Sequence, residues 1–228
     1  MQLLSVGLAR SIWLFDVNEL TPSGKMIFPD ILLWLGEKYA FQTFPKSIAE
    51  IDQEKKGYIF KSGHFQTNEG SIGVNFSFFG DGLVAETWAS TEKSDAFLED
   101  LLQSATTKFD LAYTSATVRT KTYVSEVNVR LDHPLRNLNP RLERFCQMIN
   151  ELFMRRHLPP FEMTGIIFSP DTSATSYKPP GLLIERKAGV PFTENRFWSR
   201  SPFTTADHLS ALGEFENLLE EALVIGSR

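Results

Sequence analysis

The sequence contains one cysteine and no long apolar run, and each absence excludes a class of protein. Cys146 has no second cysteine with which to form an internal disulfide, which favours a reducing compartment. The longest unbroken apolar run, Ile31–Leu35, is far shorter than the about 20 residues that a membrane-spanning helix needs. The first residues lack the basic segment of a secretory signal, and Arg10 interrupts the apolar stretch that follows. We therefore expect a cytoplasmic protein that makes no membrane contact.

The standard motifs of metal, nucleotide and hydrolase sites are also missing. The histidines show no HxH or HExxH spacing, so the sequence predicts no zinc site; they are His64, His133, His157 and His208. Gly80-Asp81-Gly82 lacks the third glycine and the helix start of a dinucleotide-binding loop, and no GxxxxGK(S/T) phosphate loop occurs. There is no GxSxG nucleophile motif either. We expect no metal, no cofactor and no catalytic site of these kinds.

The composition is that of an ordinary globular protein. Hydrophobic residues make up 42% and charged residues 22% of the 228 residues, so the chain is long enough and apolar enough to bury a sizeable core. The 19 phenylalanines indicate a core rich in aromatic packing. No linker rich in proline, glycine or serine forces a domain boundary. We expect one domain over residues 1–228, with two α+β halves, 1–114 and 115–228, as the alternative.

The pattern of apolar residues predicts an α+β fold with a mixed, mainly antiparallel sheet and amphipathic helices on one face. The best hairpin signal is Gly80-Asp81-Gly82 between two apolar runs. Ser94 and Asn139 are expected to cap helices. The expected strands are 3–17, 58–66, 72–79, 83–88, 118–131, 163–168 and 181–187. The expected helices are 30–39, 94–109, 140–156 and one that begins near residue 205.

One pattern occurs twice along the chain. Residues 72–109 and 163–223 each contain two apolar strand-like runs, a tryptophan, a junction rich in serine or threonine, and an amphipathic helix. The sequence therefore predicts a pseudo-repeat of ββα units. If the units are equivalent, Trp88 and Trp198 lie where the second strand ends, and we expect both to be largely buried. The second copy includes a long stretch, 188–203, that we expect to be irregular.

The basic residues of the second half are mostly arginines. Residues 119–206 contain 13 basic and eight acidic residues, although the whole chain has a net charge of −5. Arginine makes oriented, bidentate contacts with carboxylates, whereas lysine offers a hydrated point charge. This distribution favours a partner with an acidic surface, while the overall acidity disfavours nucleic acid. Arginines paired with glutamates on a solvated surface are the simpler explanation.

The segment 186–200 has the composition of a binding loop. Cations alternate there with large aromatic residues, as in protein–protein hot spots. The alternative is that the aromatic side chains cover the core and the arginines extend to solvent. We hypothesise a non-catalytic module of the immunity, adaptor or regulatory type that binds another protein. Its expected binding residues are Arg186, Arg196, Phe197, Trp198 and Arg200.

A second hypothesis comes from a short motif. Pro170-Asp171, followed by Glu185-Arg186-Lys187 in an apolar strand, resembles the PD-(D/E)xK signature of restriction-endonuclease-like nucleases. The resemblance covers some 20 residues. It implies that Asp171 and Glu185 hold Mg²⁺ while Lys187 assists attack on a phosphate. The alternative function is therefore a magnesium-dependent nuclease.

Overall fold

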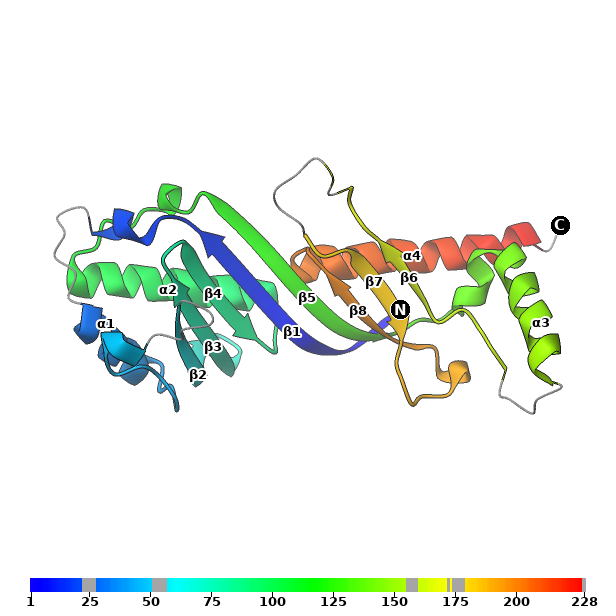
Figure 1. Cartoon of the computed structure of the whole chain (residues 1–228), viewed down its shortest axis with the longest axis horizontal. Coiled ribbons are helices and arrows are strands. Elements are labelled where there is room, and N and C mark those ends of the chain that lie inside the picture. Colours follow the sequence, from blue (N-terminus) through cyan, green and yellow to red (C-terminus); the bar gives the residue numbers. More distant parts are fainter. Residues whose placement is uncertain (22–27, 51–56, 155–159, 172, 174–178, 227–228) are drawn as a thin grey trace. The chain divides into compact units, whose positions relative to one another are not determined.

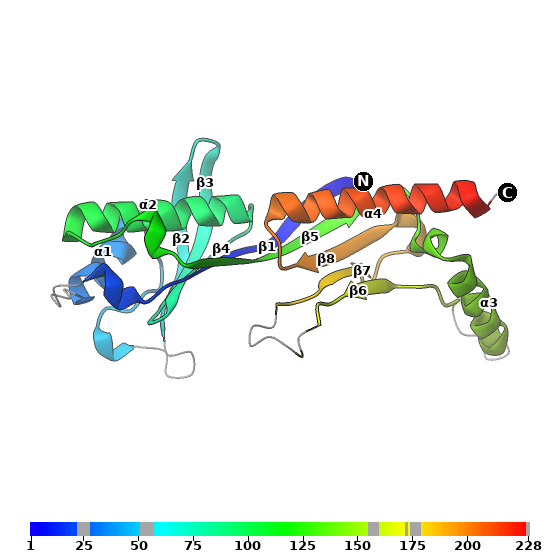
Figure 2. The same ribbon diagram turned by 90° about the horizontal axis from the view of Figure 1, so that it is seen from above.

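The computed structural model describes residues 1–228 except 22–27, 51–56, 155–159, 172, 174–178 and 227–228. The described residues form eight strands and four α-helices, with five short 3-10 helices between them. The strands pair in antiparallel fashion wherever their register is given, which confirms the expected α+β fold with a mainly antiparallel sheet. Among these residues no helix is both long and apolar enough to cross a bilayer. Figures 1 and 2 show the ribbon from two sides.

The chain divides into two compact units. The N-terminal unit comprises residues 6–125 and 203–205, and the C-terminal unit comprises residues 1–5, 126–202 and 206–228. The N-terminal unit contains β1 (Gln2–Leu14), α1 (Phe28–Lys38), β2 (Gly57–Thr67), β3 (Gly70–Phe79), β4 (Gly82–Thr87) and α2 (Thr91–Phe109). The C-terminal unit contains β5 (Thr120–Arg130), α3 (Pro140–Met154), β6 (Gly165–Phe168), β7 (Leu182–Arg186), β8 (Arg196–Ser201) and α4 (Thr205–Gly226). Strands β1 and β5 run through both units.

The core of the N-terminal unit is aromatic, as the composition predicted. Phe97 of α2 packs edge-on against Phe76 of β3 at 5.8 Å, and Phe60 of β2 lies 5.4 Å from Phe76. All three rings are fully buried. Burying a ring of this size typically stabilises a fold by about 3–5 kcal/mol relative to alanine. The short η1 helix (Val17–Leu20), α1 and α2 line a small apolar cavity of about 50 Å³ in this unit.

The two units repeat one order of elements: strand, helix, three strands, helix. The strand order is β2-β3-β4-β1 in the first and β6-β7-β8-β5 in the second. From the last strand of each unit into the helix that follows, equivalent residues are 114 apart. Thr91 and Thr205 illustrate this: each begins its helix, and each donates its backbone N–H to the hydroxyl of the other, at 3.0 and 2.7 Å. Ser11 of β1 donates to the carbonyl of Thr91, and Ser125 of β5 donates to the hydroxyl of Thr205. The repeat is therefore longer than the two ββα segments expected from the sequence.

The tryptophans do not occupy equivalent positions in this repeat. Trp88 follows the end of β4 and is 55% exposed, whereas Trp198 is half-buried inside β8. The expectation that both would be largely buried was wrong for Trp88. A spacing of 114 matches Trp198 to Val84 instead, so the shared tryptophan in the sequence pattern is a coincidence of composition.

Two other expectations are corrected. The cap of α2 is Ser90, not Ser94: Ser90 has an extended backbone and its hydroxyl accepts from the N–H of Lys93, while the buried hydroxyl of Ser94 donates to the carbonyl of Ala9. The stretch 188–203, expected to be irregular, contains a short helix η5 (Phe192–Glu194) and strand β8. The inward residues of β8 include Ser199 and Ser201, so the strand lacks the apolar alternation that would reveal it.

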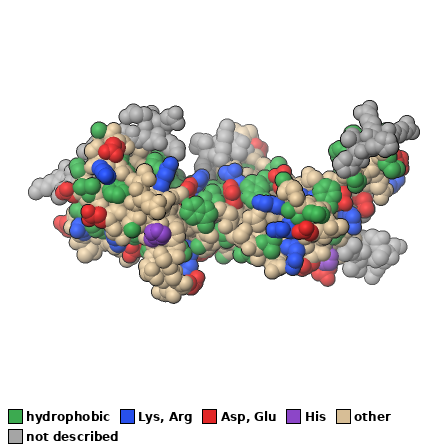
Figure 3. All heavy atoms as spheres, turned by 90° about the horizontal axis from the view of Figure 1, so that it is seen from below, with side chains coloured by type: hydrophobic (Ala, Val, Ile, Leu, Met, Phe, Trp, Pro, Cys, Tyr) green, Lys and Arg blue, Asp and Glu red, His purple; other side chains and the backbone are tan. Residues whose placement is uncertain are grey.

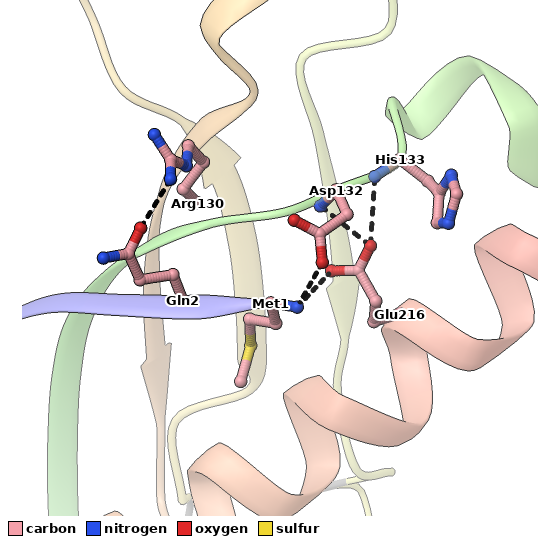
Figure 4. A network of polar contacts seen from close by, with 6 residues as sticks. All are labelled: Met1, Gln2, Arg130, Asp132, His133 and Glu216. Carbon is pink, nitrogen blue, oxygen red and sulfur yellow. Dashed lines mark hydrogen bonds and ion pairs between the residues drawn. The ribbon is translucent and has the colours of Figure 1, made fainter.

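A polar network fixes the end of β5 in the C-terminal unit (Figure 4). One carboxylate oxygen of Glu216 on α4 accepts from the backbone N–H groups of Asp132 and His133, at 2.9 and 3.0 Å. The amino group of Met1 donates to Asp132 at 2.7 Å; this hydrogen bond raises the pKa of the amino group and lowers that of Asp132. Arg130 donates to the side chain of Gln2 at 2.6 Å. The network holds Arg130 and the following residues in place.

Candidate protein-binding surface

Two hollows border the short helix η5 in the C-terminal unit. One has a volume of about 250 Å³ and is lined by Pro134, Arg136, Glu162, Arg186, Phe192, Thr193 and Asn195. The other has a volume of about 390 Å³ and is lined by Leu4, Arg130, Thr193, Glu194 and Arg196. Thr193 belongs to both linings, so the two hollows form one surface. We call it the η5 surface.

Arg186 ends β7 on the side of the sheet that faces the core, and its position depends on three contacts. One guanidinium nitrogen donates to the carbonyl of Phe192 at 2.8 Å, and another donates to Glu162 at 3.1 Å. The guanidinium also lies over the ring of Phe192 at 4.6 Å and over that of Phe197 at 5.3 Å. These aromatic faces are favourable for a cation. The side chain is therefore held in one orientation.

The same guanidinium is buried, and one of its N–H donors has no acceptor within the described residues. The Arg186 side chain is only 6% exposed, and that donor is its Nε. Burial lowers the pKa of Arg186, while Glu162 opposes that shift. A buried donor without an acceptor costs about 1–3 kcal/mol. The nitrogen is enclosed by the protein, so the donors that a partner could reach belong to the neighbouring exposed arginines.

The η5 surface carries more positive than negative charge. Arg136 in the short helix η4 (Leu135–Leu138) lies 3.7 Å from Glu162, which Arg186 also contacts, so two cations share one carboxylate. In the second hollow, Arg196 lies 3.6 Å from Glu194, and Arg130 donates to the neutral side chain of Gln2. Figure 3 shows basic side chains beside hydrophobic and acidic ones on the face seen from below Figure 1. Such a surface attracts acidic partners.

The structure separates the residues expected to bind a partner. Phe197 is fully buried, so it packs in the core and does not present its ring to a partner. Arg196 lines the second hollow and Arg186 the first. Trp198 and Arg200 alternate with the buried residues of β8 and are half-buried, and Arg200 lies 3.7 Å from Glu126 of β5. The core-packing interpretation of segment 186–200 therefore holds for Phe197, while Arg186 and Arg196 line hollows.

Sequence reasoning missed the residues that other elements bring to this surface. Arg130 and Arg136 come from β5 and η4, 56 and 50 positions before Arg186. Glu162, which orients Arg186, precedes β6. The excess of arginine between residues 119 and 206 was the one signal that pointed to them. The pairing of β5 with β8 brings them together, and that pairing was not predicted because β8 was not.

The residues of the nuclease alternative lie in different places. Glu185 pairs with Gly165 at one end of the β6–β7 ladder, and Asp171 follows Phe168 beyond the other end. At about 3.4 Å per residue, the three residues from Glu185 to Leu182 already span about 10 Å. Asp171 accepts a hydrogen bond from the N–H of Ser173, and the contacts with Ser173 lower the pKa of Asp171.

Lys187 follows Glu185 by two positions, and both side chains are exposed. In the part of the chain that the structure describes, no three His, Cys, Asp or Glu side chains are placed to hold a metal ion. These placements give the nuclease alternative no support.

Sequence comparison adds no relative to this description. No protein-family model matches the chain, and no curated protein matches it either. Function is therefore inferred from the geometry and charge of the η5 surface.

Proposed function

We propose that this protein is a non-catalytic binding module that recognises an acidic segment of another protein through the η5 surface. The observation that carries the proposal is the group of arginines that lines the two hollows: Arg186 is oriented by Phe192 and Glu162, and the side chains of Arg136 and Arg196 are exposed. Carboxylates of a partner would pair with the exposed guanidinium groups. Hydrogen bonds between charged groups are about twice as strong as neutral ones.

A protein partner fits this surface better than a nucleic acid does. The chain has a net charge of −5, which repels a long polyanion, whereas the local excess of arginine attracts a short acidic segment. Arginines next to an aromatic ring, here Phe192, are typical of the residues that dominate protein–protein binding energy. We infer an immunity, adaptor or regulatory role, and the single cysteine favours the cytoplasm as the compartment.

Charge reversal at the rim of the hollows tests the proposal. The double variant Arg136→Glu/Arg196→Glu changes two exposed side chains and leaves Arg186 in place. Binding of a fluorescent polyglutamate peptide, measured by anisotropy at low salt, should weaken at least tenfold. Affinity capture from the native source should lose the acidic partners that the unmodified protein retains.

The matched control is Lys61→Glu, which reverses one exposed charge on β2 of the N-terminal unit. This variant should bind the peptide as the unmodified protein does. Circular dichroism establishes that all variants are folded. Equal peptide binding by the folded double variant and by the control would reject the η5 surface as the site.

A further inference from the structure

Helix α3 exposes an apolar stripe that its own chain does not cover. Leu142, Phe145, Met148 and Leu152 follow one another at helical spacing and are each between 43% and 59% exposed. Residues three, four and seven apart lie on one face of a helix, so these four side chains form a continuous stripe. We call it the α3 stripe. Helices in water normally bury such a face.

The equivalent helix of the other unit shows what is unusual here. In the N-terminal unit, α1 buries Leu32 and Leu35 in the core of that unit. In the C-terminal unit, α3 packs against η4 and the segment before β6: Phe153 stacks on Phe161 at 4.6 Å, and Asn150 exchanges two hydrogen bonds with the Phe161 backbone. Figures 1 and 2 both show α3 apart from β6, β7 and β8. One side of α3 is anchored, and the stripe faces away from it.

Two charged residues beside the stripe indicate which kind of partner would pack on it. Arg144 and Glu151 are seven residues apart, so they lie on the same flank of the stripe, two helical turns from each other. Within the described residues neither side chain forms an ion pair. In an antiparallel pair of such helices, Arg144 of each copy comes opposite Glu151 of the other. A two-fold axis makes this contact twice, whereas in a parallel pair the two flanks lie on opposite sides of the pair and these charges do not meet.

We propose that α3 pairs antiparallel with α3 of a second copy of this chain, through the α3 stripe. The complementary pattern of Arg144 and Glu151 selects the antiparallel orientation, and Phe145, Met148 and Leu152 supply the apolar contact. This proposal concerns a different surface from η5 and does not depend on the acidic partner.

The exposed area of the α3 stripe is that of a small interface. Each side chain of the stripe is about half exposed and so offers on the order of 100 Å², since a large aromatic side chain buries 150–250 Å² in full. Two copies with their flanking charges bury roughly 1,000 Å², which is at the low end of specific interfaces. We therefore expect a reversible dimer with a Kd on the order of 10–100 μM.

Analytical ultracentrifugation of the full chain over about 1–500 μM, a concentration range that brackets the expected Kd, tests the proposal. The unmodified protein should shift from monomer to dimer. Arg144→Glu and Glu151→Arg should each weaken the dimer at least tenfold, because each places like charges in both contacts. An equimolar mixture of the two variants should dimerise at least as tightly as the unmodified protein. A monomer at every concentration would overturn the proposal.

Three controls separate the possible results. Lys61→Glu reverses an exposed charge on β2 of the N-terminal unit and should not change dimerisation. Phe145→Ser should abolish dimerisation without altering the folded spectrum. Arg144→Glu should bind the polyglutamate peptide as the unmodified protein does, so loss of the dimer and loss of the η5 site are distinguished. Equal dimerisation by Arg144→Glu, Glu151→Arg and the unmodified protein would reject the antiparallel pairing.

Discussion

His208 should make the stability of this protein depend on pH. The ring lies on α4 and is fully buried, and its Nε2 is 2.8 Å from the hydroxyl of Ser199. That hydroxyl donates its own hydrogen to the carbonyl of Leu183 at 2.7 Å, so it accepts from an Nε2–H group of a neutral imidazole. Burial lowers the pKa of His208 from 6.5 to about 4, because the charged form would lose its hydration.

The sign of the effect follows from the two pKa values. The unfolded chain takes up a proton on this histidine near pH 6.5 and the folded protein only near pH 4, so the unfolded state binds more protons in between. The free energy of unfolding therefore falls as pH drops below about 6.5, and it stops falling near pH 4. At 1.36 kcal/mol per pKa unit, the loss is roughly 2 kcal/mol by pH 5 and about 3 kcal/mol in full.

Urea unfolding at pH 7 and pH 5 measures this loss directly. Carboxylates also titrate over the range, so the comparison is with His208→Gln, which cannot take up the proton and keeps a hydrogen-bond donor. The unmodified protein should lose about 2 kcal/mol more than this variant between the two pH values. His64→Gln changes an exposed histidine and should behave like the unmodified protein. Equal losses in the unmodified protein and in His208→Gln would refute the argument.

Two further substitutions test the packing. Thr91→Val keeps the shape of the side chain but leaves the buried N–H of Thr205 without its acceptor, so the free energy of unfolding should fall by about 1–3 kcal/mol in urea titration; no change would mean that water replaces the hydroxyl. Trp88→Ala should lower the melting temperature only slightly because the indole is mostly exposed, whereas Trp13→Ala removes a buried indole and should cost about 3–5 kcal/mol. A large effect of Trp88→Ala in calorimetry would contradict the exposed position.

The sequence predicted those elements whose apolar periodicity was regular. Strand β5 alternates clearly, and Val127, Val129 and Leu131 are indeed buried on one side. Strand β8 was missed because its inward positions include Ser199 and Ser201. The hydroxyl of Ser199 donates to the distant carbonyl of Leu183 instead of packing as an apolar group. Burial of a small polar side chain depends on a hydrogen-bond partner elsewhere in the fold, and a linear pattern does not contain that information.

The candidate site was predictable to the extent that it lies in one segment. The cations of segment 186–200 were visible, but the sequence could not tell Arg186, which is held in the structure, from Arg196, which borders solvent. Phe197 is an aromatic residue of the type found in hot spots, but it is fully buried in the core. Arg136 reaches the surface from η4, and only strand pairing reveals that.

The two compact units do not coincide with the two halves of the sequence. The C-terminal half of the chain supplies residues 115–125 and 203–205 to the N-terminal unit, and the N-terminal half supplies residues 1–5 to the C-terminal unit. Each half thus completes the unit of the other with a strand or a helix start. A break in the connection near Thr114 would not release two independent proteins. We therefore expect the fragments 1–114 and 115–228 to behave as a split protein, whose reassembly reports that both are present.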